Sequence, residues 1–157
     1  MQDRFRSFLE IIEAFNKEGV EYIVVGGVAV NLHGLPRNTE DIDMFIRIDP
    51  DNVERLRIAL KSIYNDEAID EITLEELKGY SVLRYGTPDG FYIDFIARLG
   101  EFATFEDIQF EEMNVQGLKV RVATAQSLHW MKKDTLRLKD RQDAQFLLEI
   151  LREENDE

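Results

Sequence analysis

The stretch of sequence that decides the fold is Val24-Val-Gly-Gly-Val-Ala-Val-Asn-Leu-His-Gly-Leu-Pro-Arg-Asn-Thr-Glu-Asp-Ile-Asp-Met-Phe-Ile46. An apolar run ends there in Gly26 and Gly27, a short helical pattern follows, and Asp41 and Asp43 come next. Side chains two residues apart in a strand point to the same side, so both carboxylates should project together from apolar surroundings. Clustered charges need a partner, and a Gly-rich turn that opens a helix offers N–H groups to phosphate. The stretch therefore predicts a site for a metal-bound nucleotide.

The composition favours a soluble, folded protein. Of 157 residues, 44% are hydrophobic and 32% are charged, which predicts a single domain over residues 1–157. The longest apolar runs are too short to span a membrane. The net charge of −13 argues against broad binding to nucleic acid backbones but leaves a local basic groove open. The chain has no cysteine and no secretion signal at its start, so we expect a cytoplasmic protein.

Hydrophobic periodicity predicts a mixed α/β (α+β) fold, in which helices flank a mixed sheet and two helices finish the chain. The expected helices cover residues 2–18, 27–33, 51–64, 124–135 and 140–154, with partly helical segments at 65–78 and 104–109. The expected strands cover residues 22–25, 42–48, 81–85, 91–96, 113–115 and 118–122. The acidic tail over residues 153–157 is expected to be frayed.

A third carboxylate, Asp94, lies within the apolar run Phe91-Tyr-Ile-Asp-Phe-Ile-Ala97. If its strand lies beside the strand of Asp41 and Asp43, the three carboxylates form one cluster that needs cations. Oxygen ligands favour Mg²⁺ or Mn²⁺ over zinc, and two such ions suit phosphoryl or nucleotidyl transfer. Asp94 would then help to activate the incoming hydroxyl group. The alternative is that Asp94 pairs with a buried arginine such as Arg84.

These residues resemble the nucleotidyltransferase superfamily typified by DNA polymerase beta. Its pattern is a Gly-Gly or Gly-Ser pair, an acidic-apolar-acidic motif, and a third acidic residue on a later strand. Here Gly26-Gly27, Asp41-Ile-Asp43 and Ile93-Asp94-Phe95 match it in order. Small bacterial members from abortive-infection and toxin–antitoxin systems look most similar to this chain. The similarity lies in the sequence of residues 37–43 and in the segments Met131-Lys132 and Lys139-Asp140-Arg-Gln-Asp143. The resemblance spans residues 20 to about 150.

The resemblance implies a role for each matched residue. The backbone of Gly26 and Gly27 would approach a nucleoside triphosphate (NTP), from which pyrophosphate leaves. Asp41, Asp43 and Asp94 would hold two Mg²⁺ or Mn²⁺ ions. Further nucleotide contacts would come from the following side chains: Lys132, Lys139, Arg37 and Thr39. Many members carry serine at the position of Gly27, so a hydroxyl contact to phosphate is missing here.

Simpler structural roles stay open for several of these residues. Arg37 could anchor the loop before the aspartate pair, and Thr39 could hold that loop by hydrogen bonds. Lys139, Asp140 and Asp143 could form an interhelical ion-pair network. We expect His33 to be a packing or capping residue and Asp89 to serve a turn.

The sequence thus predicts a Mg²⁺-dependent enzyme that moves a nucleoside monophosphate (NMP) from an NTP to a hydroxyl acceptor. The acceptor could be an RNA end, a protein or a small molecule. A partner protein from a neighbouring gene would fit a toxin–antitoxin setting, which is an analogy at the level of the fold. Two alternatives are a non-catalytic nucleotide-binding or regulatory module and a carboxylate-rich metal-binding protein.

Overall fold

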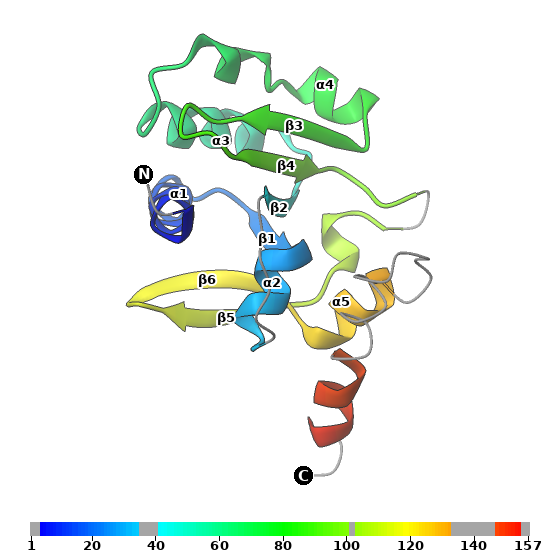
Figure 1. Ribbon diagram of the computed structural model, residues 1–157. Coiled ribbons are helices and arrows are strands. Elements are labelled where there is room, and N and C mark those ends of the chain that lie inside the picture. The colour runs from blue at the N-terminus through cyan, green and yellow to red at the C-terminus, as the bar shows by residue number, and fades with distance from the viewer. Residues whose placement is uncertain (1–3, 35–40, 101–102, 133–146, 155–157) are drawn as a thin grey trace.

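A mixed sheet of six strands lies at the centre of the computed structural model, which describes residues 4–34, 41–100, 103–132 and 147–154 (Figure 1). The strands are β1 (Tyr22–Val25), β2 (Asp41–Ile46), β3 (Val82–Gly86), β4 (Tyr92–Ile96), β5 (Phe110–Val115) and β6 (Leu118–Ala123). Their order across the sheet is β3-β4-β2-β1-β6-β5. The pairs β1–β6 and β2–β4 are parallel, while β1–β2, β3–β4 and β5–β6 are antiparallel. The predicted α/β fold with a mixed sheet is therefore confirmed.

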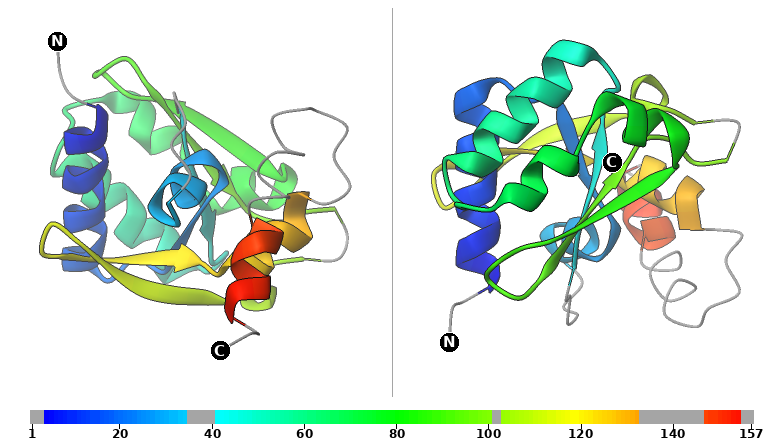
Figure 2. Two further views of the ribbon diagram at one scale, coloured as in Figure 1. Left: turned by 60° about the horizontal axis from the view of Figure 1, so that its bottom comes forward. Right: turned by 90° about the horizontal axis from the view of Figure 1, so that it is seen from above.

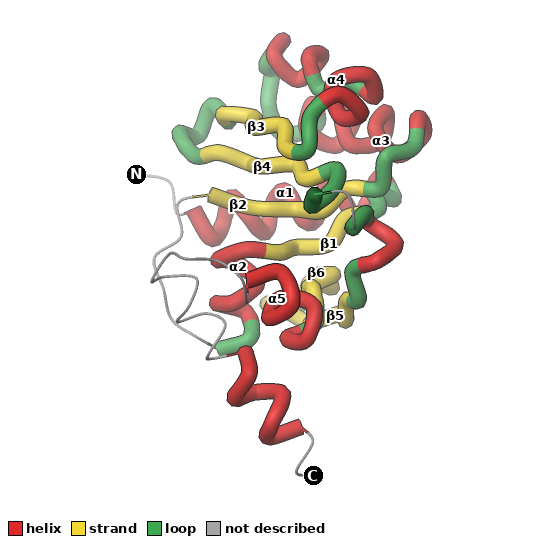
Figure 3. The backbone as a smooth tube through the Cα atoms, turned by 90° about the vertical axis from the view of Figure 1, so that its right-hand side faces the viewer, coloured by secondary structure: helices red, strands yellow, loops and turns green. Residues whose placement is uncertain are grey.

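Helices cover both faces of this sheet. They are α1 (Arg4–Glu18), α2 (Gly26–Leu32), α3 (Pro50–Lys61), α4 (Leu74–Gly79) and α5 (Ala125–Lys132), with 3₁₀ turns η1 (Glu67–Glu71) and η2 (Phe105–Asp107). Figure 3 shows α1 and α3 behind the sheet and α2 and α5 in front of it. Helices α1 and α3 pack against each other (Figure 2). None of the described helices is long and apolar enough to cross a bilayer.

The core lies mainly between the sheet and the α1–α3 layer. Ile11 and Phe15 of α1 and Leu56 and Leu60 of α3 are fully buried. Their spacing of four residues puts each pair on one side of its helix, which is why the apolar periodicity of the sequence predicted these helices. The buried face of each helix therefore follows directly from its sequence.

Local signals in the sequence account for the ends of several elements. Asp49 caps α3, because its carboxylate accepts a hydrogen bond from the Asn52 N–H at 3.2 Å, and Pro50 is the first helical residue. Gln116 and Gly117 both have positive φ, 50° and 88°, as a tight β-hairpin turn requires. The order of the described elements agrees with the prediction, and most boundaries differ by one to three residues.

The last described segment agrees with the predicted final helix. Residues 147–154 are helical, within the helix expected over 140–154, and Glu153 and Glu154 at its end are exposed. Residues 140–146 of that predicted helix, and residues 155–157 of the acidic tail that we expect to be frayed, lie outside the described residues.

Buried tyrosines tie the β3–β4 hairpin to the segment before it. The Tyr64 hydroxyl donates a hydrogen bond to Asp89 at 2.9 Å, and the Tyr85 hydroxyl donates one to Asp66 at 2.7 Å. Asp89 thus has the structural turn role that the sequence predicted. Burial and the neighbouring carboxylate raise the pKa of Tyr64 and of Tyr85 above the usual 10.0. Both effects disfavour the charged phenolate.

These tyrosines should make the fold sensitive to alkaline pH. As the pH rises past 10.0, the unfolded chain releases both phenol protons before the folded chain does. The stability that they contribute is therefore complete below this pH and is lost above it. We expect the free energy of unfolding, measured with urea at pH 8 and at pH 11, to fall less in a Tyr64→Phe, Tyr85→Phe double variant than in the parent chain.

Tyr80→Phe is the matched control, because Tyr80 is 61% exposed. It should leave the alkaline loss unchanged. An identical loss in the parent and the double variant would contradict the assignment.

Candidate active site

The register of the sheet brings the three predicted carboxylates together. In the parallel β2–β4 pair, Asp43 lies directly opposite Asp94, and in the β1–β2 pair it lies opposite Val25. Asp41 is two residues before Asp43 on the same face of β2, while Ile42 between them is buried on the other face. The sequence made a carboxylate cluster conditional on the two aspartate-bearing strands lying side by side, and the β2–β4 pairing meets this condition.

The carboxylates lie at the border between the core and the solvent. The Asp94 side chain is 14% exposed and the Asp41 side chain is 32% exposed. Asp94 is flanked along β4 by the fully buried Ile93 and Phe95, whose side chains point away from it. Like charges on adjacent strands repel each other, more so when partly buried, so this arrangement needs a cation.

Arg84 of β3 supplies a cation. Its Nε donates to Asp94 Oδ1 at 2.8 Å, and its Nη2 donates to Asp94 Oδ2 and to Asp41 Oδ2, each at 3.1 Å. The guanidinium also lies over the ring of Tyr92, 4.7 Å from its centre. These hydrogen bonds to Asp94, with the negative charges of Asp94 and Asp41, raise the pKa of Arg84.

The sequence left open, as the alternative to a metal-binding carboxylate cluster, that Asp94 pairs with Arg84. The structure contains this pair, although the Arg84 side chain is 53% exposed and not buried as that alternative supposed. Because the arginine end of this pair is exposed, the guanidinium can turn into water and the pair can open. The pair is thus compatible with a metal site that forms from the same carboxylates.

Gly26 lies against Asp43 at the start of α2. Its φ is 68°, and a Cβ atom at this position would lie 2.1 Å from Asp43 Oδ2 and 2.9 Å from Asp43 Cγ. Both the left-handed backbone and the close carboxylate demand glycine here. The sequence predicted Gly26 for phosphate approach, and the contact with Asp43 is a reason that it did not foresee. Gly27 follows as the second residue of α2.

The structure describes little of the predicted cationic and loop residues. Arg37, Thr39 and Lys139 lie outside the described residues, as does the side chain of Lys132. The backbone of Lys132 ends α5, and α5 packs against α2. His33 has the structural role that we expected, because its Nε2 lies 2.9 Å from the Ala123 carbonyl oxygen.

The donor set fits a hard divalent cation. Three aspartates offer oxygen ligands only, which Mg²⁺ and Mn²⁺ accept readily. Among the residues that the structure describes, no group of three or more histidine, aspartate or glutamate side chains is arranged around one ion position. Two of the three carboxylates are instead bound to the Arg84 guanidinium.

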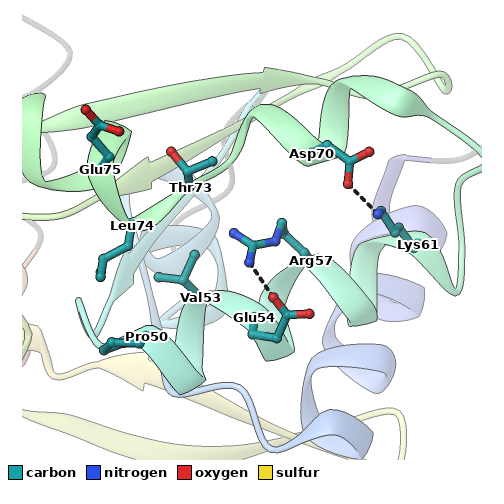
Figure 4. A pocket seen from close by; sticks show the side chains of 9 residues that line it. All are labelled: Pro50, Val53, Glu54, Arg57, Lys61, Asp70, Thr73, Leu74 and Glu75. Carbon is teal, nitrogen blue, oxygen red and sulfur yellow. Dashed lines mark hydrogen bonds and ion pairs between the residues drawn. The ribbon is translucent and has the colours of Figure 1, made fainter.

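A groove of about 720 Å³ lies elsewhere, between α3 and the η1–α4 segment (Figure 4). Its cations already have partners: Arg57 binds Glu54 and donates to the Ile72 carbonyl oxygen at 2.6 Å, and Lys61 binds Asp70. The groove residues drawn in Figure 4 include none of the three predicted catalytic aspartates. We therefore place the candidate active site at the carboxylates of the sheet.

Substitution of Gly26 should destabilise the fold through Asp43. Gly26→Ala should cost about 1–2 kcal/mol for the left-handed backbone, plus a further ~1–3 kcal/mol for the clash with the carboxylate. Gly19→Ala is the matched control, because Gly19 has a similar φ of 72° and no atom within 4 Å of the added Cβ. Urea unfolding should show the larger loss for Gly26→Ala.

The same measurement in an Asp43→Ala background isolates the contact. Without the carboxylate, the extra cost of Gly26→Ala over Gly19→Ala should shrink, because only the Cβ of residue 43, 3.0 Å from the added Cβ, still lies close. Equal losses for the two glycine variants in the parent chain would show that Asp43 does not approach Gly26 closely.

Comparison with solved structures shows the same fold in other proteins. A Thermotoga maritima protein assigned as a nucleotidyltransferase aligns with a TM-score of 0.53 at 18% identity, over 96% of this chain and 93% of that one. The lincosamide antibiotic adenylyltransferase LnuA, bound to lincomycin, gives 0.59 at 18% identity, over 90% and 94%. ANT(2″)-Ia in complex with adenylyl-2″-tobramycin gives 0.57 at 15% identity, over 94% and 89%.

A search of curated protein sequences found no match. A family model does match: the one described as nucleotidyl transferase AbiEii toxin, type IV toxin–antitoxin system, aligns with residues 8–149. The match includes both glycines, all three aspartates and the end of α5. With the fold and the carboxylates in place, this chain belongs to the AbiEii nucleotidyltransferase toxin family.

Proposed function

We propose that this nucleotidyltransferase moves an NMP from an NTP to a hydroxyl acceptor, with release of pyrophosphate, and that it uses Mg²⁺ or Mn²⁺. The observation that carries the proposal is the pairing of Asp43 with Asp94 across the parallel strands β2 and β4, beside the start of α2. Like charges in this arrangement favour a cation, and the family to which the chain belongs supplies the reaction class.

The three aspartates would divide the work. Asp41 and Asp43, two residues apart on β2, would hold two ions from one side, and Asp94 would hold one of them from β4. When bound, such a pair of ions stabilises the attacking and leaving oxygens of an in-line displacement. Asp94 would also orient the acceptor hydroxyl and take up its proton. Gly26 would serve by leaving room for the Asp43 carboxylate.

The triphosphate would lie against the start of α2. Val25, which precedes the helix, gives no side-chain cap, so the backbone N–H groups of Gly26 and Gly27 have no acceptor from that residue. Lys132 is proposed as a cationic contact because α5 packs against α2. Arg37, Thr39 and Lys139 remain predictions from the family resemblance. A single domain over residues 1–157 is likewise part of the proposal.

The acceptor is proposed by class only: an RNA end, a protein side chain or a small molecule. The structural neighbours LnuA and ANT(2″)-Ia were solved with the antibiotic lincomycin and with an adenylylated tobramycin. Their likeness makes a small hydroxyl compound one candidate. The family description adds a toxin–antitoxin setting, which favours a macromolecular acceptor and a partner protein from a neighbouring gene. The net charge of −13 disfavours wide, unassisted contact with RNA.

A second function has one observation in its favour. A nucleotide-binding module without catalysis would also keep Asp41 and Asp94 in the ion pairs that Arg84 forms. Such a module has less need of a third carboxylate, however, and Asp43 adds to the repulsion. Catalysis is therefore the leading proposal.

A labelling experiment tests the function. The full chain is incubated with each α-³²P-labelled NTP, Mg²⁺ and a cell extract, and the label is followed into RNA, protein and small molecules. We expect transfer to one of these classes. Asp43→Asn should reduce transfer by more than about a hundredfold, the upper end of what loss of a supporting contact alone costs. Asp70→Asn is the matched control, because Asp70 pairs with Lys61 in the separate groove.

Each result has a distinct meaning. Label that moves equally with Asp43→Asn would refute the assigned site. Nucleotide that binds without any movement of label would favour the non-catalytic module. If no NTP binds in the presence of Mg²⁺, both functions fail.

A further inference from the structure

The Arg84 guanidinium lies where the proposed metal ions need the aspartate oxygens. Both oxygens of Asp94 accept N–H groups from Arg84, at 2.8 and 3.1 Å, and Oδ2 of Asp41 accepts a third at 3.1 Å. A planar fork that binds carboxylates in this two-pronged way gives the strongest geometry available to an arginine. The pair of ligands from β2 and β4 is thus held together by an internal cation.

We propose that Arg84 is a latch on the metal site: in the ion-free chain its guanidinium binds the carboxylates of Asp41 and Asp94. The guanidinium must leave these carboxylates before they bind a divalent cation. This inference rests on the proposed function, because it takes these aspartates as metal ligands. Arg84 is a positioning residue in this scheme. It acts on the reaction through the ligands and sets how strongly they bind the ion.

Charge and geometry both oppose the binding of a divalent ion and of Arg84 to the same carboxylates at the same time. A divalent ion binds carboxylate oxygens at about 2.0–2.1 Å, and it would lie close to a guanidinium that hydrogen-bonds the same oxygens. The positive charges of the ion and the arginine repel each other. Binding of the ion must therefore either displace Arg84 or overcome this repulsion, and displacement costs less for an exposed side chain.

The surroundings of Arg84 allow it to leave without disturbing the core. Its side chain is 53% exposed, so the guanidinium can turn into water. Tyr92, whose ring lies beneath it, is itself 46% exposed. The position of Arg84 on the aspartates is nevertheless defined, because the guanidinium stacks 4.7 Å from the centre of the Tyr92 ring.

Gly86 leaves room for the Tyr92 ring in this stack. It lies opposite Tyr92 in the β3–β4 pair and two residues from Arg84, on the same face of β3. A Cβ atom at Gly86 would come within 3.2 Å of Tyr92 Cε1, so glycine lets the ring lie across β3. Arg84, Gly86 and Tyr92 thus form one arrangement that presents the guanidinium to the aspartates.

Metal binding by the full chain tests the latch without any measurement of activity. We expect Arg84→Gln to bind Mn²⁺ about tenfold more tightly than the parent, a change equivalent to ~1.4 kcal/mol, by titration calorimetry and by the EPR signal of free Mn²⁺. Arg57→Gln is the matched control, because Arg57 pairs with Glu54 on α3 in the separate groove. It should bind Mn²⁺ like the parent. Equal or weaker binding by Arg84→Gln would overturn the proposal.

Thermal unfolding separates a latch from a purely structural arginine. Without metal, Arg84→Gln should melt at a lower temperature than the parent, because the carboxylates lose their cation. Excess Mn²⁺ should raise the melting temperature of Arg84→Gln by more than that of the parent, because in this variant the ion displaces no guanidinium. A purely structural arginine would lower the melting temperature by the same amount with and without Mn²⁺, and that result would refute the latch.

Arg84→Lys keeps the test decisive if Arg84→Gln does not fold. Lysine is a point charge that cannot bind two carboxylates through one planar fork. Its Mn²⁺ affinity should therefore exceed that of the parent, and an affinity equal to the parent's would contradict a latch that depends on the fork. Absence of Mn²⁺ binding in every variant would instead refute the metal-dependent function on which the inference rests.

Discussion

The repulsion between Asp43 and Asp94 is the constraint on which the rest of this site depends. The two carboxylates lie directly opposite each other on parallel strands at the edge of the core. Such a pair destabilises a sheet unless a cation compensates it. Arg84 gives this compensation on one side, through Asp94 and Asp41. The same negative potential that destabilises the sheet would attract a divalent ion, so the stability of the sheet and the proposed binding of metal would be coupled.

The Asp43 carboxylate also determines how β1 becomes α2. Because it lies against Gly26, the chain must leave β1 through a residue without a side chain, and this residue also has a left-handed φ of 68°. The helix then starts beside the carboxylates. The proposed phosphate-binding turn and the proposed metal ligand are separate in the sequence, and the contact between Gly26 and Asp43 joins them. The Gly26-Gly27 and Asp41-Ile-Asp43 motifs are therefore two parts of one packing arrangement.

Sequence patterns predicted what depends on local periodicity. Apolar runs and turn residues placed the strands of Asp41, Asp43 and Asp94, and the fold made those strands neighbours. The part that depends on the register between strands was harder to predict. Arg84 lies opposite Asp94 because the turn of the β3–β4 hairpin centres near Asp89, a relation that could have been counted from the Pro-Asp-Gly turn. Asn52 bonds Glu21 and Arg47 backbone groups, and no sequence pattern announces such a contact.

The cation that compensates the aspartates also bears on whether the site is catalytic. A chain that only needed a stable sheet could replace one carboxylate by an amide, which removes the repulsion without requiring a partner. This chain instead keeps three aspartates and pairs two of them with an arginine whose side chain is half-exposed and can turn into water. A removable cation is useful only if the ligands must at times be free. The combination of retained charge and a partner that can leave therefore favours a working metal site over a retired one.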